Sequence, residues 1–242
     1  MKHRITEEKI RFVMQQVTLS MGLLLCSSIA TADDLKFGLF AGATAASDEA
    51  NSESSTTSLG GSPATITNAY SVDKNTGFVT GATVGIERYE RYSFELEAAY
   101  RQVDFDAHGN LIANIGGVTE SLSAGGRGQI SSISLMSNGW YDFVDGGSAT
   151  FTPFVGGGIG VASNRSDGQI SSQGPLFGLD IENRTGLGND SETEFAWQFG
   201  AGVRFSLRSN AVMSLSYRYF DGGEINGEFD VDMHNIVLAI RF

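Results

Sequence analysis

The sequence predicts an all-β fold, an eight-stranded antiparallel up-and-down transmembrane β-barrel. Three observations predict it. Apolar and polar residues alternate along eight separate runs, and this period of two is that of a β-strand. Long and short gaps between the runs alternate, as in a barrel with long loops at one end and tight turns at the other. The chain also ends inside an alternating strand, "HNIVLAIRF" (234–242), on an aromatic residue.

The N-terminus is typical of a secretory signal peptide over residues 1–32. Basic residues lead into the apolar run 17–30, which is too short to span a membrane as a helix, and small residues follow it. The barrel domain is therefore expected to cover residues 33–242. The basic lead is long, so that both Met1 and Met14 are possible starts.

Composition excludes several classes of function. The single cysteine, Cys26, lies in the predicted signal peptide, so the mature chain is expected to hold no disulfide and no cysteine metal site. The formal net charge of −12 opposes binding to nucleic acid. No motif for a cofactor is found, and no cofactor is expected.

The eight alternating runs account for the strands in chain order, at 35–43, 78–88, 93–105, 129–143, 152–162, 195–207, 211–221 and 231–242. The connections expected to be long external loops are 44–77, 106–128, 163–194 and 222–230. Within the first of them, the Ser/Thr-rich stretch 46–69 is expected to be mobile, because it contains few apolar residues.

Each run has one bulky apolar face and one face of small or charged residues. The inside of an eight-stranded barrel is narrow, so the small and charged face is expected inside and the bulky face is expected to contact lipid. The residues expected to face lipid are Phe94, Leu96, Phe195, Trp197, Phe199, Ile236, Leu238 and Ile240. The residues expected to form a charge network inside the barrel are Glu87, Glu95, Glu97, Arg101, Arg204, Arg218 and Arg241, with Asp142 as a further candidate.

This interior network allows two interpretations, because charges buried inside a barrel must be either paired or solvated. It is either an ion-pair core that plugs the barrel or a charged gate in a narrow conduit. The plug is favoured because eight strands leave little open space. Gly156, Gly158 and Gly160 fall on the inward face and are expected to leave room for the long Arg and Glu side chains opposite.

Other motifs give no site. His108 lies in a long connection, and His234 near the last strand is not part of a His-x-Ser pattern. The acidic stretch 221–232 lacks the spacing of an EF-hand, and the glycines of 156–160 are not followed by a helical pattern. No catalytic, cofactor-binding or metal-binding residue is therefore assigned. An aromatic girdle is expected near the short turns, at Tyr89, Tyr92, Tyr141 and Phe143.

Several strand motifs resemble those of the opacity-protein and surface-antigen superfamily of small bacterial outer-membrane barrels. They are "LMSNGWYDF" (135–143), "FTPFVGGGIGVAS" (151–163), "FAWQFGAGVRF" (195–205) and "SLSYRYFD" (214–221). The resemblance implies the outer membrane of a Gram-negative bacterium, variable surface loops that contact external partners, and no catalytic residues. A last strand that ends on Phe242 also resembles the sorting signal read by the barrel assembly machinery.

The sequence therefore predicts a non-enzymatic outer-membrane barrel with a surface-interaction role, adhesin- or opacity-like. Its expected partners are outer-membrane lipid, the barrel assembly machinery and an unidentified surface ligand bound through the loops. Three alternatives stay open: a lipid-modifying barrel enzyme, a small low-conductance pore, and a soluble secreted β-barrel that binds an apolar ligand.

Overall fold

A computed structural model describes residues 35–47, 49–59, 62–88, 91–144, 151–176, 179–187, 191–207, 211–225 and 229–242. The predicted signal peptide, both candidate start residues and Cys26 lie outside this part. The described chain forms eleven strands: β1 (Leu35–Ala46), β2 (Glu49–Leu59), β3 (Ser62–Lys74), β4 (Thr76–Arg88), β5 (Tyr92–Ile115), β6 (Val118–Asp142), β7 (Phe151–Leu176), β8 (Leu179–Leu187), β9 (Ser191–Ser206), β10 (Val212–Ile225) and β11 (Phe229–Arg241). Among the described residues, no helix is long and apolar enough to cross a membrane.

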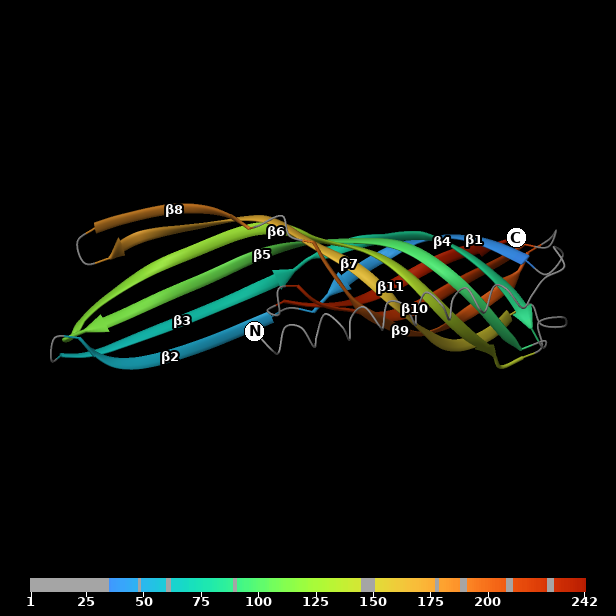
Figure 1. Cartoon of the computed structure of the whole chain (residues 1–242), viewed down its shortest axis with the longest axis horizontal. Coiled ribbons are helices and arrows are strands. Elements are labelled where there is room, and N and C mark those ends of the chain that lie inside the picture. The colour runs from blue at the N-terminus through green and yellow to red at the C-terminus, as the bar shows by residue number, and fades with distance from the viewer. Residues whose placement is uncertain are drawn as a thin grey trace, which may run out of the picture.

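Eight of these strands form a closed antiparallel ring in the order β1, β4, β5, β6, β7, β9, β10 and β11 (Figure 1, right half). The ring closes where β1 pairs with β11, from Gly38 opposite Arg241 to Ala46 opposite Met233. Phe37 and Phe242 extend this closure by exchanging both backbone hydrogen bonds, at 3.2 and 2.8 Å. The predicted fold class is therefore confirmed, and closure leaves the ring without an unpaired edge.

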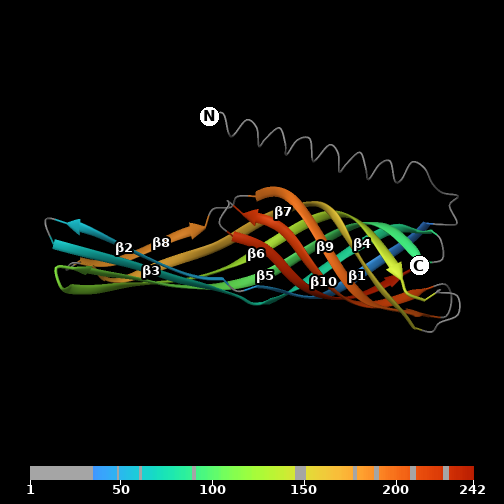
Figure 2. The ribbon, with the colours of Figure 1, turned by 90° about the horizontal axis from the view of Figure 1, so that it is seen from below.

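A second sheet extends from one end of the ring. The strands β5, β6 and β7 are 24, 25 and 26 residues long. Beyond the ring, β3 pairs with the distal half of β5 and β8 with the distal half of β7, while β2 pairs with β3. The result is an open six-stranded sheet, β2-β3-β5-β6-β7-β8, here called the protruding sheet. It forms the left half of Figure 1 and a thin layer in Figure 2.

Where the structure describes them, the predicted long loops are mostly strand, and the stretch 46–69 that was expected to be mobile forms β2 and part of β3. Threonine favours strands, and hydroxyl pairs across β2 and β3 add contacts. Ser54 and Thr67 lie 3.1 Å apart, and Thr56 and Thr65 lie 3.4 Å apart. The connection between β5 and β6 is a two-residue turn at Gly116 and Gly117, whose φ angles of 58° and 86° suit glycine.

The inside of the ring is layered. The half nearer the protruding sheet is filled by an apolar cluster that includes Phe105, Met136, Phe220 and Met233. The prediction that only small and charged residues fill the inside is wrong for this layer. Large side chains fit there because the same cluster contains small ones, such as Ala162 and Ala196, from the facing strands. The charged residues occupy the next layer, toward the short turns.

Candidate functional site

The charged layer is built around β5, where alternate residues point to the same side of the strand. Glu95, Glu97 and Arg101 are each buried, and the exposed fraction of Glu97 is 0%. Strands β10 and β11 bring Arg218 and Arg241 to the same layer from the other side of the ring. Arg204 of β9 lies beside Glu95 on the short-turn side of this layer, so the structure brings together six of the seven residues predicted for the interior network.

Glu97 is the centre of this layer. Its Oε2 accepts hydrogen bonds from Nη1 of Arg218 at 2.7 Å and from Nδ2 of Asn138 at 3.0 Å. Its Oε1 accepts a bond from Nη2 of Arg101 at 3.4 Å. The guanidinium of Arg101 also lies 3.8 Å from the ring centre of Phe220, which joins the charged layer to the apolar cluster. One carboxylate therefore serves two buried arginines.

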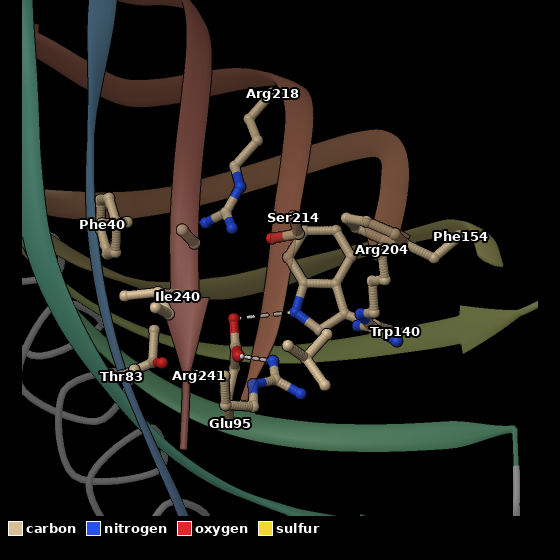
Figure 3. A pocket seen from close by; sticks show the side chains of 13 residues that line it. Phe40, Thr83, Glu95, Trp140, Phe154, Arg204, Ser214, Arg218, Ile240 and Arg241 are labelled. Atoms are coloured by element: carbon tan, nitrogen blue, oxygen red, sulfur yellow. Dashed lines mark hydrogen bonds and ion pairs between the residues drawn. The ribbon is translucent and has the colours of Figure 1, made fainter. Parts of the chain in front are cut away.

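Glu95 holds a second set of partners nearer the short turns (Figure 3). Its Oε1 accepts a hydrogen bond from Nε1 of Trp140 at 2.8 Å, and its Oε2 accepts one from Nη2 of Arg241 at 2.7 Å. Arg204 pairs with Asp142, the further candidate for the interior network, and its guanidinium lies over the ring of Phe154. Both oxygens of Glu95 and both oxygens of Glu97 therefore accept hydrogen bonds, and a network of this kind rigidifies the side chains.

The remaining predicted member, Glu87, has its backbone in β4 opposite Ser93, but its side chain lies outside the described residues. Sequence reasoning missed the neutral members of the layer, chiefly Asn138, Trp140 and Gln198. Gln198 donates to Oδ1 of Asn138 at 2.7 Å and to Glu97 at 3.4 Å. The alternation of inward and outward residues along β6 could have identified two of them, because Asn138 and Trp140 fall on the inward side of that alternation.

A small cavity lies beside this layer at the short-turn end (Figure 3). Its lining includes Phe40, Trp140, Phe154, Arg204 and Arg218. The room for a water-sized sphere inside it is about 20 Å³, which suits a single water. Aromatic and guanidinium groups therefore close the ring from this side, while the apolar cluster closes it from the other.

The three inward glycines of β7 make room for neighbours other than those predicted. A Cβ added at Gly156 would meet the ring of Trp140, and one at Gly158 would meet the amide of Asn138. A Cβ at Gly160 would lie 2.8 Å from Sδ of Met136. The glycines accommodate Trp, Asn and Met side chains of β6 rather than Arg and Glu.

The two histidines that the structure describes lie outside the interior of the ring. His234 is exposed on β11, and its Nδ1 lies 2.6 Å from Oη of Tyr217. His108 is exposed on β5, and its Nε2 lies 4.0 Å from Oδ2 of Asp73. Among the described residues no hydrogen bond joins either histidine to a serine, and no group of three or more His, Cys, Asp or Glu side chains could hold a metal.

The outer face of the ring is apolar. Of the residues predicted to face lipid, Leu96 and Ile240 are half-buried and the others are exposed, namely Phe94, Phe195, Trp197, Phe199, Ile236 and Leu238. The terminal Phe242 is also exposed.

Aromatic rings mark both limits of this apolar band. Tyr92, Tyr141 and Phe143 contact one another at the short-turn end, as expected; Tyr89 lies outside the described residues. At the other limit lie Trp197 and Phe199, with centroids 6.0 Å apart.

A shallow groove of about 650 Å³ lies beyond the apolar band, where the ring passes into the protruding sheet. Polar side chains line it, including Asp104, Asp106, Arg127, Gln129 and Asp167. Nδ2 of Asn75 donates to Oδ2 of Asp106 at 3.1 Å, and Arg165 pairs with Asp167 at 3.1 Å. The outer face therefore changes from apolar to polar along the same strands.

Comparison with known proteins agrees with this architecture. The family model described as outer membrane protein beta-barrel domain matches residues 24–242. Outer membrane protein PagN of Salmonella typhimurium is 25% identical over 154 residues, which make up 62% of this chain and 59% of PagN. The chain thus spans about three fifths of the length of this relative.

The solved structures that match this chain include Neisserial surface protein A, with 17% identity, a TM-score of 0.44, and coverage of 85% of this chain and 95% of that one. OprG from Pseudomonas aeruginosa has 15% identity, a TM-score of 0.41, and coverage of 86% and 95%. Because the family model matches most of this chain, the chain belongs to the outer membrane protein beta-barrel domain family. It lies in the outer membrane of a Gram-negative bacterium.

Proposed function

We propose that this chain is a non-enzymatic surface-interaction protein, in which the ring is a plugged anchor and the protruding sheet presents the binding surface. The observation that carries this proposal is the open six-stranded sheet beyond the apolar band. On β9, Phe205, whose ring lies 6.0 Å from that of Phe151 at the short-turn end, is eight residues from Trp197 at the other limit of the band. At about 3.3 Å per residue and a strand tilt of about 40° they span ~20 Å, close to the lipid band of such barrels.

The length of the strands supports an external sheet. A spanning strand needs about 9–11 residues, whereas β6 has 25 and extends for about 80 Å. The sheet continues from the end opposite the short turns, and long connections of outer-membrane barrels lie outside the cell. In this proposal the predicted external connections form a hydrogen-bonded sheet instead of loops.

Two open edges give this sheet its means of interaction. Strands β2 and β8 each pair on one side only among the described residues, so that each is an edge strand to which another strand can add. The side chains of Ser52 to Ser58 on β2 are exposed, and Glu53 is the only charge among them. The edge therefore carries few of the charges that usually prevent strand addition.

The chemistry of the surface supports a neutral or cationic partner. The protein as a whole is acidic, with a net charge of −12, and Asp104, Asp106 and Asp167 line the groove at the base of the sheet. Such a surface repels polyanions. A protein segment that adds to the edge of β2 as a strand fits these observations.

A shortened variant tests this proposal. Residues 48–74, which contain β2 and β3, are replaced by a Gly/Ser turn, and intact cells that display either form are screened against candidate surfaces. The full-length chain is expected to mediate attachment and the shortened one to lose most of it. Heat-modifiable migration on a gel controls for folding of the ring, and a Gly/Ser replacement of residues 145–149, between β6 and β7 in the chain, serves as the matched control. Equal attachment by both forms would refute the proposal.

A small pore is the second candidate, and the layered interior weighs against it. Apolar side chains fill one half of the ring, and the charged layer holds its arginines in place. We expect no large steady channels from the protein in planar bilayers. Steady conductance would instead favour the pore and would place the gate among the arginine pairs.

The enzyme alternative finds little support in the placement of the histidines. His234 hydrogen-bonds to a tyrosine on the outer face, and His108 is exposed on the sheet.

We also propose that Phe242 is part of a sorting signal for the barrel assembly machinery. We expect Phe242→Ala to slow assembly of newly exported protein in cells, while refolding of the purified chain into detergent stays unchanged.

A further inference from the structure

We propose that the outer face of β9, β10 and β11 binds a lipid whose headgroup carries a primary ammonium group. This site is separate from the protruding sheet and does not rest on the surface-interaction proposal. It consists of five rings and two carboxylates, here called the headgroup surface: Trp197, Phe199, Tyr217, Tyr219, His234, Asp221 and Asp232.

The five rings form one continuous platform. Phe199 lies opposite Tyr219, and Tyr219 lies opposite His234, so that one row of rings crosses three strands. The centroids are 5.3 Å apart in both pairs. Trp197 stacks on Phe199 and lies 5.4 Å from Tyr219, while Oη of Tyr217 lies 2.6 Å from Nδ1 of His234. The hydrogen bond and the ring contacts fix the platform against the barrel wall.

Two carboxylates lie in the next row toward the protruding sheet. Asp221 is directly opposite Asp232 across β10 and β11, and Trp197 is opposite Asp221. Like charges in this position repel each other. Asp221 accepts a hydrogen bond from the backbone N of Gly223, and Asp232 accepts one from Oγ of Ser47, both at 2.9 Å. Among the described residues neither aspartate forms an ion pair, and the Lys74 ammonium nearby donates to the backbone O of Asp230 at 3.1 Å.

Position and charge identify the occupant. The headgroup surface lies at the distal limit of the apolar band, where lipid headgroups meet the protein. An ammonium group is attracted by the faces of Trp and Tyr and also by the two carboxylates, which it would bridge. The aromatic residues at the short-turn end do not form a comparable site for a cation, because a cationic side chain is already present there: Arg91 donates to Oη of Tyr141 at 3.5 Å. An aromatic girdle alone would not explain the facing carboxylates.

Lipid retention tests the proposal directly. The refolded protein is reconstituted in vesicles of equal parts phosphatidylglycerol and phosphatidylethanolamine, extracted in mild detergent, and analysed for bound lipid by native mass spectrometry. A cation–π contact together with a charge pair predicts an enrichment of phosphatidylethanolamine of several-fold to about tenfold. Phosphatidylethanolamine with an acetylated amine is expected to show no enrichment.

Matched variants assign the effect to the surface. Asp221→Asn with Asp232→Asn is expected to abolish the enrichment and, by removing the repulsion, to raise the unfolding temperature in phosphatidylglycerol alone. Asp104→Asn with Asp106→Asn removes two outward carboxylates of β5 and is expected to leave the enrichment unchanged. Equal retention of both lipids by the unaltered protein would overturn the proposal. Retention of phosphatidylglycerol that requires Mg²⁺ and is lost in EDTA would overturn it too, because it would identify a metal as the occupant.

Discussion

The ring and the protruding sheet share three strands, β5, β6 and β7, and yet their packing differs. In the ring every strand has two neighbours, and the inward side chains fill a closed interior. In the sheet the same strands continue between two open edges, and many side chains of β2 and β6 are exposed. The difference shows that closure and interior packing stabilise the molecule, while the sheet tolerates change and offers a surface.

The largest difference in stability between variants of the ring and of the sheet is expected when a charge inside the ring is removed. Glu97→Ala leaves Arg101 and Arg218 buried without their shared carboxylate, and we expect a loss of about 3–5 kcal/mol in the free energy of unfolding. Denaturant titration in detergent measures it. Glu53→Ala on the exposed β2 is the control and is expected to stay within about 0.5 kcal/mol. Similar losses of unfolding free energy for both variants would contradict the claim that the packed ring, and not the sheet, stabilises the molecule.

A pair of glycines gives an intermediate effect. Gly158→Ala in the ring pushes a methyl group against Asn138, which we expect to cost about 1–3 kcal/mol in the free energy of unfolding. Gly125→Ala in the sheet meets no atom within 4 Å and is expected to be neutral or stabilising by up to about 1 kcal/mol. The same titration compares them, and a stabilising Gly158→Ala would contradict the packed interior.

Much of this architecture could be predicted from the sequence, because strand period and loop spacing depend on local patterns. Alternation placed Glu95, Glu97 and Arg101 on one face, and the structure brings them together inside the ring. The apolar layer around Phe220 could not be predicted in this way, since its room depends on Ala162 and Ala196 from other strands. The protruding sheet was missed because β2 is stabilised by pairing with β3 rather than by an apolar face of its own.

The smallest effect on stability is expected at the edge strand. Ser55→Lys with Thr57→Lys places two charges on β2 at exposed side chains outside the two hydroxyl pairs, and should change the free energy of unfolding by less than about 0.5 kcal/mol. Attachment by intact cells is nevertheless expected to fall, because lysines on an edge prevent strand addition. Unfolding and attachment assays on the same preparation separate the two outcomes, and a large loss of stability would show that the edge is structural.

Amide hydrogen exchange of the protein in a lipid bilayer tests the contrast between ring and sheet most directly. We predict that backbone amides of β9, β10 and β11 within the apolar band stay protected for days, while those of β2 and β8 exchange within minutes to hours. Protection of β2 equal to that of β10, or rapid exchange throughout the ring, would contradict a plugged anchor that carries an open external sheet.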